Sequence, residues 1–283
     1  MKVALVGASG QLAVPLVRLL VGSGHEVIAL SRSKADLPGV KVLSYGSSLT
    51  AATTTIGPLD AVVSVAPLPL IGDVVELARL SSAARIVAFG SASVLYKGSS
   101  SSALERDFVQ QQRHAESLLA SAADEAGVGW TLIRPTMIYG AGDDLNVAVL
   151  SRLVRRSPVF PIPFGAHGLR QPVHVEDLAK AAFSALKQEV ALGRAYNVGG
   201  GERLAYGEFV RRIIRHQHSR CVILRVPRTV LSLVMALLRH REGFQYLREE
   251  MIDRMFDDLT VDNSVVEREL GLAPRPFLPD DED

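Results

Sequence analysis

Cysteine is almost absent from this chain of 283 residues, since Cys221 is the only one. A disulfide framework within the chain is therefore excluded, which is typical of proteins in a reducing compartment, and we expect a cytoplasmic protein. A lone cysteine behaves in most proteins as a small buried hydrophobe, and we expect that role for Cys221. No His, Cys or carboxylate cluster has metal-ligand spacing, so the sequence predicts no metal site.

The chain also lacks an excess of charge of one sign. Its 31 basic and 30 acidic residues give a formal net charge of +1. No strong overall field attracts a polyanion, so we expect no nucleic-acid partner. The apolar run after Met1 and Lys2 meets Gly7 at once and is too short for a secretory signal.

Long hydrophobic runs are missing as well. The longest, Thr229–Leu238, is about half of what a transmembrane helix needs, so no membrane span is predicted. A buried helix of a second lobe is the favoured interpretation of this run. A basic amphipathic helix resting on a membrane or a partner is the alternative, because arginines flank the run at Arg225, Arg228, Arg239 and Arg241.

Strand and helix patterns alternate through the first 200 residues. Short apolar runs of strand length predict strands over Lys2–Val6, His25–Leu30, Val40–Ser44, Asp60–Val65, Arg85–Phe89, Trp130–Arg134 and Ala195–Val198. Helical spacing predicts helices over Gln11–Val21, Gly72–Leu80, Ser102–Glu125, Ala141–Arg156 and Val175–Leu186. This alternation predicts an α/β fold, a Rossmann-type doubly wound parallel sheet.

The pattern changes after residue 200, where helices follow with one strand candidate, Cys221–Val226. We therefore expect a Rossmann domain over 1–200 and a small, mostly helical C-terminal lobe over 201–283 that binds substrate. A Pro-rich loop insertion near 157–172 is expected to contribute to this second lobe.

A glycine-rich turn follows the first strand and opens the first helix. Gly7 allows a tight turn, and Gly10 allows the backbone to approach a pyrophosphate. The free amides at the helix start and its positive dipole end then face the anion. In this sequence and structural context the motif predicts binding of a nicotinamide dinucleotide by Gly7, Ser9, Gly10, Gln11 and Leu12.

The end of the second strand indicates which dinucleotide is bound. A carboxylate at this position would hold the ribose hydroxyls of NAD(H), but the sequence has Ser31, Arg32 and Lys34 instead. Arg32 can donate charge-assisted hydrogen bonds to a 2′-phosphate. The sequence therefore favours NADP(H), with NAD(H) as the alternative.

Several motifs, in this order, make the chain resemble the short-chain dehydrogenase/reductase superfamily, in its extended or atypical branch of NAD-dependent epimerase/dehydratase proteins. These motifs lie at Gly7–Ala13, Asp60–Ala66, Gly90–Tyr96, Ile133–Gly140, Gln171–Ala179 and Tyr196–Gly200. The resemblance implies that Ser64, Val65, Ala66 and Pro135 line the cofactor. It also implies that Ser91 is the hydroxyl of the catalytic set.

The chain departs from this family at the catalytic tyrosine and lysine. The family pattern Tyr-x-x-x-Lys aligns with Phe108 and Gln112, which have neither the proton nor the charge for that chemistry. Tyr139 is our candidate for a substitute acid. Tyr96 and His114 are further options, and packing or surface roles are the competing interpretation for all three.

Two functions remain open on the sequence. The first is an NADP(H)-dependent oxidoreductase or nucleotide-sugar epimerase-like enzyme, a possible homodimer, in which Arg170 and Arg203 could bind a sugar diphosphate. The second is a non-catalytic NADPH-binding scaffold or redox sensor. The stretch 157–173 resembles the nucleotide-binding accessory subunit of respiratory complex I, which also lacks the catalytic pair and favours the second function.

Overall fold

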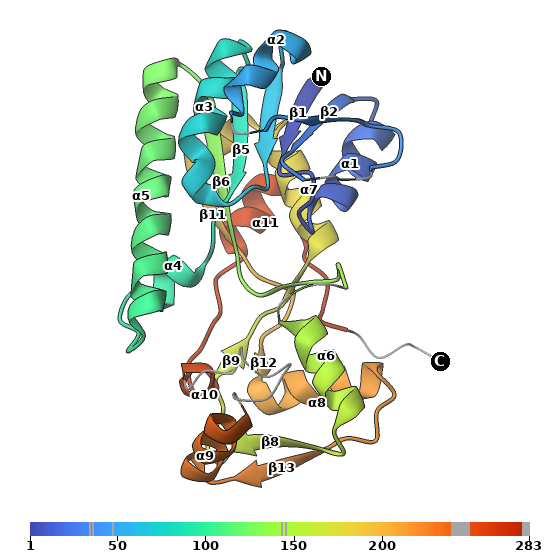
Figure 1. Cartoon of the computed structure of the whole chain (residues 1–283), viewed down its shortest axis with the longest axis vertical. Coiled ribbons are helices and arrows are strands. Elements are labelled where there is room, and N and C mark those ends of the chain that lie inside the picture. Colours follow the sequence, from blue (N-terminus) through green and yellow to red (C-terminus); the bar gives the residue numbers. More distant parts are fainter. Residues whose placement is uncertain are drawn as a thin grey trace. The chain divides into compact units, whose positions relative to one another are not determined.

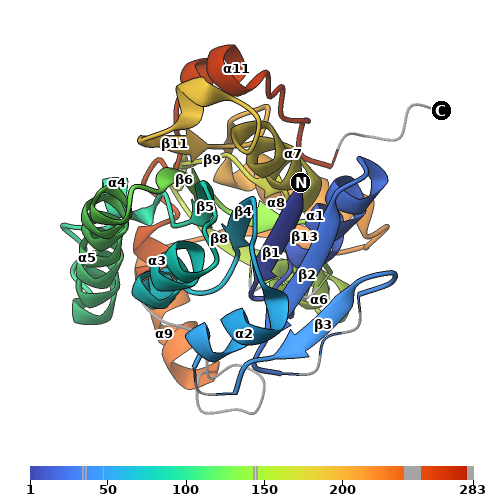
Figure 2. The same ribbon diagram turned by 90° about the horizontal axis from the view of Figure 1, so that it is seen from above.

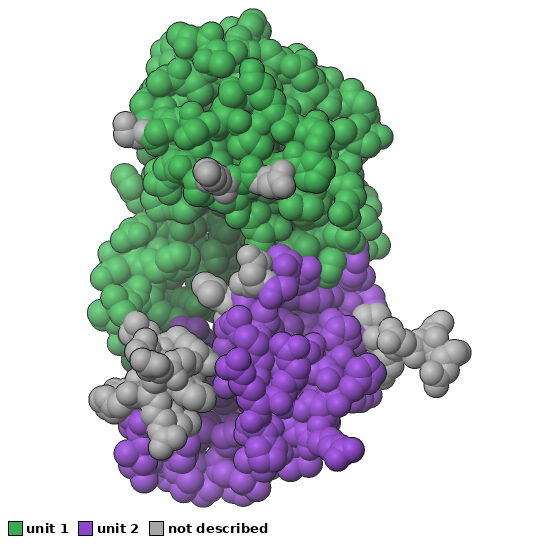
Figure 3. Space-filling view, turned by 45° about the vertical axis from the view of Figure 1, so that its right-hand side comes forward, with its two compact units in different colours: residues 1–136, 174–198, 262–274 green, residues 137–173, 199–261, 275–283 purple. Residues whose placement is uncertain are grey.

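The computed structural model describes residues 1–33, 35, 37–46, 48–142, 144, 146–238 and 250–278. The chain forms two compact units, which Figure 3 colours separately. Unit 1 comprises 1–136, 174–198 and 262–274, and unit 2 comprises 137–173, 199–261 and 275–283. The predicted division into domains at residue 200 stays a prediction; the compact units are interleaved along the chain.

Unit 1 is built on a seven-stranded parallel sheet, which confirms the predicted Rossmann-type fold (Figure 1). The strand order is β11-β6-β5-β4-β1-β2-β3. The chain adds β2 and β3 on one side of β1 and then adds β4, β5, β6 and β11 on its other side, so the order reverses between β1 and β4, as in doubly wound folds. The strands span β1 Lys2–Val6, β2 Glu26–Ser31, β3 Lys41–Ser44, β4 Ala61–Ser64, β5 Arg85–Phe89, β6 Gly129–Pro135 and β11 Arg194–Val198.

Helices cover both faces of this sheet, so its central strands are buried on both sides (Figure 2). Helices α3 and α5 pack together on one face, and α1 and α7 pack together on the other. Apolar residues of β1, β4 and β5 form a core with α3 and α5, which explains the near-continuous apolar runs of the sequence. The helices of unit 1 are α1 Ala13–Gly22, α2 Thr53–Ile56, α3 Ile71–Leu80, α4 Ser93–Tyr96, α5 Ala103–Ala126, α7 Val175–Ala185 and α11 Ser264–Leu270, with short 3₁₀ turns η1 Thr50–Ala52, η2 Leu68–Leu70 and η3 Glu189–Ala191.

The register of the parallel strands brings their carboxyl ends to one edge of the sheet. Val6 lies opposite both Leu30 and Ser64, and Ser64 lies opposite Ala88. The turns that follow β1, β2, β4 and β5 therefore start side by side. This is the edge at which open α/β sheets bind ligands.

Unit 2 combines helices with short two-stranded sheets around its own apolar core. Strand β8 pairs in parallel with β13, and β9 pairs in antiparallel fashion with β12. The elements of this part of the chain are β7 Ile138–Tyr139, α6 Val147–Arg156, β8 Val159–Pro163, β9 Leu169–Arg170, β10 Val173–His174, β12 Leu204–Ala205, α8 Tyr206–His216, β13 Val222–Val226, α9 Arg228–Leu238 and α10 Glu250–Asp253.

Two local expectations were wrong. The Pro-rich stretch near 157–172 is not only a loop, because it contains strand β8, whose Phe160 and Ile162 are buried in the core of unit 2. Among the described strands, β8 pairs only with β13. Pro161 and Pro163 are tolerated because their nitrogens, which carry no hydrogen to donate, face away from β13. Helix α6 begins at Val147 rather than near residue 141, since the Asp144 carboxylate accepts from the amides of Asn146 and Ala148.

Candidate functional site

The glycine turn after β1 is held by backbone hydrogen bonds. The amide of Gly7 donates to Leu30 O at 2.9 Å, and that of Gly10 donates to Gly7 O at 2.8 Å. Gly7 has a φ of +91°, and a Cβ there would lie 2.6 Å from the backbone nitrogen of Ala66. Only glycine therefore fits where the turn passes the end of β4.

The same turn provides one backbone partner at the start of α1, because the amide of Ala13 donates to Gly10 O at 2.9 Å. No side chain caps this helix, and its first turn contains no acidic residue. Pro15 is the third residue of the helix, so it lacks one of the amides that would need a partner there. The positive end of the helix dipole is therefore open to an anion.

Three of the other predicted residues of this turn differ in exposure. Leu12 is buried and anchors the turn, whereas Ser9 is exposed. Gln11 is half-buried, and its side-chain oxygen Oε1 is buried with no hydrogen-bond partner among the described residues. An added Cβ at Gly10 would lie 3.2 Å from Gly7 O and 3.7 Å from Val65 Cγ2. The turn thus has a tight backbone and an unused acceptor, and it fits a phosphate-bearing ligand with a hydroxyl or amide donor.

The end of β2 is cationic in this structure rather than acidic. Arg32 is exposed directly after the strand, and the Ser31 hydroxyl accepts from the amide of Ser33 at 3.3 Å. Lys34, which the sequence also suggested for a phosphate, lies outside the described residues. The described end of β2 thus offers a guanidinium and hydroxyl groups.

The residues predicted to line a cofactor after β4 and β6 also lie at this edge. Ser64 ends β4 and is buried, and the amide of Val65 donates to Val6 O. Pro135 ends β6, and its carbonyl accepts from the amide of Ala92 at 2.9 Å. Ala66 is buried beside Gly7. Unit 1 therefore brings all the predicted cofactor residues that it contains to one edge.

Ser91 follows β5 and is half-buried. Its Oγ accepts a hydrogen bond from the amide of Ser93 at 3.2 Å, which orders the start of α4. A hydroxyl that accepts from an amide keeps its own hydrogen to donate. Ser91 can therefore donate to an oxygen of a ligand at this edge.

Helix α5 carries the two positions that differ from the family pattern. Phe108 is 42% exposed, whereas Gln112 is 6% exposed on the face that packs against the sheet. His114 is on the exposed side of the helix. The position of the family's lysine is thus buried in this chain and is occupied by a neutral amide.

Tyr139 belongs to unit 2, whereas Ser91 belongs to unit 1. The Tyr139 hydroxyl donates to Pro276 O at 3.3 Å, and the ring packs edge-on against Phe277 with centroids 4.8 Å apart. The residue is buried in the core of unit 2. This geometry gives Tyr139 a packing role, and a catalytic role for it stays a prediction.

Arg170 is not a surface charge, because it is only 3% exposed. Its guanidinium donates to Leu169 O at 2.8 Å, to Asp257 O at 2.9 Å and to Arg254 O. It also lies over the Tyr206 ring, 5.1 Å from the centroid, and burial raises the pKa of Tyr206 to about 12. These contacts give Arg170 a structural role. Arg203 likewise donates to Val261 O at 2.9 Å.

The sequence missed a paired arginine close to the predicted site. Arg134 of β6 makes two hydrogen bonds with the carboxylate of Glu116 on α5, at 2.8 and 2.7 Å. A Cβ at Gly90, the residue before Ser91, would lie 3.3 Å from this carboxylate. The pair fixes α5 to β6 under the Ser91 turn. No sequence spacing links residues on different elements in this way.

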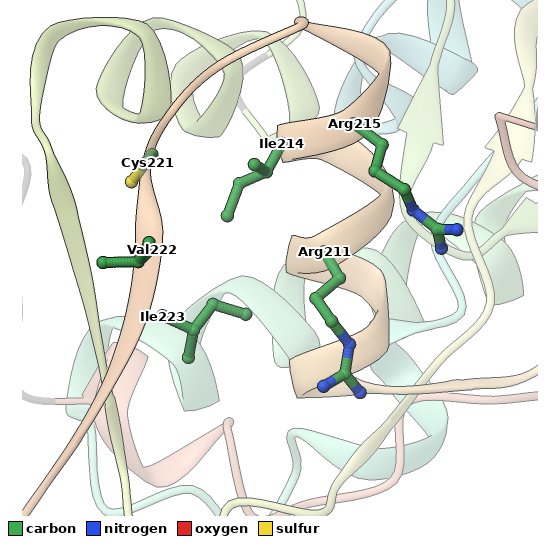
Figure 4. Close-up of a pocket in the computed structure, with 6 residues that line it drawn as sticks. All are labelled: Arg211, Ile214, Arg215, Cys221, Val222 and Ile223. Carbon is green, nitrogen blue, oxygen red and sulfur yellow. The ribbon is translucent and has the colours of Figure 1, made fainter.

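A hollow of about 250 Å³ lies in unit 2, and its lining contains none of the predicted site residues (Figure 4). It is lined by Arg211, Ile214, Arg215, Cys221, Val222 and Ile223. Both arginines bind the carboxylate of Glu208, so the hollow has no unused cation. Cys221 is buried, which confirms its expected role, and burial raises the pKa of its thiol.

Among the described residues, no three His, Cys, Asp or Glu side chains are grouped closely enough to hold a metal ion. Within the same described part of the chain, no helix is both long and apolar enough to cross a membrane.

Comparison with known proteins supports the same fold. Residues 70–199 match the NAD dependent epimerase/dehydratase family. The UDP-glucose 4-epimerase of Vibrio cholerae is 26% identical over 185 residues, which are 65% of this chain and 53% of that protein. The chain thus matches about half the length of this curated relative.

Two solved structures share the fold over almost the whole chain. The UDP-glucose 4-epimerase of Thermotoga maritima, solved with UDP-glucose, has a TM-score of 0.72 at 16% identity and covers 98% of this chain and 95% of its own. The NADPH-dependent quinone oxidoreductase QOR2 of Escherichia coli, complexed with NADPH, has a TM-score of 0.72 at 15% identity, covering 98% and 96%. At these identities the likeness concerns the fold alone.

Proposed function

We propose that unit 1 binds NADPH and that the protein acts with it on a nucleotide sugar or a small carbonyl compound, because residues 70–199 match the NAD dependent epimerase/dehydratase family. The relatives named as UDP-glucose 4-epimerases and as a quinone oxidoreductase support these two substrate classes.

The glycine turn carries this proposal. The positive φ of residue 7 and its close approach to Ala66 both require glycine. Helix α1, which has no side-chain cap, starts six residues later. A pyrophosphate over this turn would accept from backbone amides and interact with the helix dipole. No carboxylate in the first turn of α1 repels it.

The preference for NADPH over NADH rests on the end of β2. Arg32 is exposed there, and the neighbouring Ser31 and Ser33 are uncharged. A guanidinium can bind a 2′-phosphate through two hydrogen bonds, whereas a carboxylate at this position would repel it.

The remaining residues would orient the reactants. The bound cofactor would give a hydride to a carbonyl carbon in its reduced form, or accept one from a hydroxyl-bearing carbon of a sugar in its oxidised form. The chain would supply the position of the reactants and a group that donates or accepts the proton. Ser91 would donate its hydroxyl hydrogen to a carbonyl oxygen of the substrate. Tyr139 is the second proposed donor, and it would have to release Pro276 O to act.

A second function, the holding of NADPH without turnover, is favoured by one observation. The positions of the family's tyrosine and lysine are Phe108 and Gln112, and neither can move a proton at neutral pH. The resemblance to the complex I accessory subunit supports the same function and stays a prediction.

Cofactor binding is tested by titrating the purified protein with NADPH and NADH in a calorimeter. We expect Gly10→Asp to weaken both dinucleotides by at least about 100-fold, because it adds a negative charge beside the pyrophosphate. Gly22→Asp is the matched control at the other end of α1, where an added Cβ meets nothing within 4 Å. Wild-type protein that binds neither dinucleotide would exclude the proposal.

Cofactor preference is tested with Arg32→Glu in the same titration. We expect at least about tenfold weaker NADPH binding and unchanged NADH binding, since one strong charge-assisted contact is lost. Arg18→Glu changes an exposed arginine of α1 in the same way and should leave both affinities unchanged. Equal loss of both dinucleotides would argue against contact with the 2′-phosphate.

Turnover separates the two functions. NADPH oxidation is followed by absorbance with quinones and small aldehydes, and conversion of UDP-sugars in the presence of NADP+ is followed by chromatography. Turnover that Ser91→Ala abolishes supports an enzyme. Tight NADPH binding without turnover in either assay, also in the double variant Phe108→Tyr with Gln112→Lys, supports the scaffold.

A further inference from the structure

Unit 2 carries a surface whose composition differs from that of the whole chain. Although the net charge of the chain is only +1, residues 209–241 contain eight arginines and three histidines but neither Asp nor Glu. Residues 147–175 contain four arginines and again neither Asp nor Glu. Each segment contributes one strand to the ribbon formed by β8 and β13. Of these arginines, Arg211, Arg212, Arg215 and Arg228 form ion pairs with carboxylates of other segments.

The outer side of this ribbon is apolar. Val159 pairs with Val222, and Pro161 pairs with Leu224, so all four side chains point to the same face. Val159, Val222 and Leu224 are exposed on it. The opposite face is the one that buries Phe160 and Ile162 in the core of unit 2.

Helix α9, which follows β13 in the chain, also exposes apolar residues. It packs against β8 and buries Leu231 and Met235 in the core. Its other side exposes Val230, Leu233, Val234 and Leu237, with Leu233 63% and Leu237 66% exposed. A helix that is apolar on its outer as well as its inner side is unusual in a free monomer. We call the seven exposed residues Val159, Val222, Leu224, Val230, Leu233, Val234 and Leu237 the apolar face.

Cations lie where the two ribbon strands begin. Arg155 and Arg156 end α6 just before β8, and His218 and Arg220 precede β13. These two segments are held together, since Ser219 Oγ donates to Val154 O at 2.5 Å and the amide of Val222 donates to Pro158 O at 3.0 Å. Arg155, Arg156 and Arg220 are exposed and form no ion pair with any described residue.

We propose that this surface of unit 2 binds reversibly to an anionic phospholipid bilayer. The apolar face would enter the boundary between headgroups and acyl chains, and Arg155, Arg156 and Arg220 would contact lipid phosphates. A second copy of the chain fits less well, because a twofold interface would bring two sets of these arginines together without a carboxylate from either ribbon or α9. The proposed contact is peripheral, consistent with the absence of a membrane-spanning helix among the described residues.

Sedimentation of the full chain with vesicles tests this proposal. The vesicles contain either phosphatidylcholine alone or phosphatidylcholine with one third phosphatidylglycerol. We expect binding to the anionic vesicles, at least about tenfold weaker binding to the neutral ones, and release by added salt. Equal binding to both vesicles, or binding to neither, would overturn the proposal.

Two pairs of variants locate the contact. Leu233→Ser with Leu237→Ser, and separately Arg156→Gln with Arg220→Gln, should each weaken vesicle binding by at least about tenfold. The matched controls, Leu80→Ser for the apolar change and Arg18→Gln with Arg194→Gln for the charge change, alter exposed residues of unit 1 and should bind like wild type. Thermal unfolding monitored by circular dichroism verifies that each variant is folded.

Self-association is the competing outcome. Light scattering that shows a dimer in wild type and a monomer in Leu233→Ser with Leu237→Ser, without vesicle binding by either protein, would assign the apolar face to a second copy and overturn the lipid proposal.

Discussion

At the scale of single residues, Gly7 is a position of unit 1 that requires glycine. It combines a φ of +91° with a close approach to Ala66, so Gly7→Ala introduces both backbone strain and a steric clash. We expect the free energy of unfolding to fall by about 2–4 kcal/mol, measured by urea denaturation. Gly24→Ala is the control, because Gly24 has a φ of +77° but open space around its Cα. A similar loss in both variants would mean that the contact with Ala66 contributes nothing.

Arg170 supports a second prediction at this scale. Its guanidinium donates to the carbonyl oxygens of Leu169, Asp257 and Arg254, and Arg170→Met would remove all three hydrogen bonds. Leu169 O and Arg254 O would keep the backbone amides of Leu259 and Asp257, whereas Asp257 O would keep no donor among the described residues. We expect a loss of about 2–4 kcal/mol in chemical denaturation, since buried carbonyls would lose charge-assisted hydrogen bonds. Arg211→Met removes an exposed arginine paired with Glu208 and should cost less than about 1 kcal/mol. Equal costs would argue against the structural role of Arg170.

These two residues also show which site features the sequence could predict. The need for glycine at residue 7 is a property of the local backbone, and the strand-turn-helix pattern around it is local too. The partners of Arg170 are 84 and 87 residues away along the chain, and its burial depends on how α10 folds back. The sequence therefore suggested a phosphate-binding role for Arg170, whereas the structure gives it backbone partners.

At the scale of elements, helix α11 is attached to β11 by a hydrogen bond between side chains in addition to apolar packing. The Tyr196 hydroxyl donates to Glu269 Oε2 at 2.7 Å, and this hydrogen bond holds the pKa of the Glu269 carboxyl below its usual value. Burial is the main reason that the pKa of Tyr196 is raised. The contact therefore joins a neutral donor to an ionised acceptor across a wide pH range.

The lowered pKa of Glu269 determines how stability changes with pH. The stabilisation that ionised Glu269 gives to the folded state is fully present above the unfolded pKa of about 4.3. It is lost as the pH falls through the lower pKa of the folded state. We expect Tyr196→Phe to lower the melting temperature by about 2–4 °C at pH 7 and to differ less from wild type below pH of about 4. Thermal unfolding followed by circular dichroism measures both. A difference that stays constant with pH would exclude the ionised acceptor.

The elements themselves were largely predictable, because strands buried on both faces and amphipathic helices leave strong patterns in the sequence. The exceptions have physical reasons. Helix α1 starts at Ala13 rather than Gln11 because residues 8–12 are used in the turn. Strand β8 was hidden by its prolines, which a sheet of only two strands tolerates. Pairing within such a ribbon depends on β13, more than sixty residues later.

At the scale of the whole molecule, the segment 262–274 belongs to unit 1 although it follows most of unit 2 in the chain. Helix α11 in this segment packs on β11 and α7, and it buries Val266 and Leu270. We expect a fragment of residues 1–200 to unfold without cooperativity, because this apolar surface loses its cover. Joining 262–274 to the fragment through a Gly/Ser linker should restore a cooperative transition in urea. A fragment that unfolds cooperatively without the added segment would contradict this prediction.

This interleaving has a consequence for how the protein is made. A ribosome releases the chain from its amino terminus, and domains generally begin to fold as they emerge. The sheet strands of unit 1 are all synthesised by residue 198, but the helix that completes their cover comes only with residues 264–270. The apolar surface that α11 covers in the finished protein therefore stays exposed on the nascent sheet while most of unit 2 is translated. We expect chaperones to bind the nascent chain during this interval.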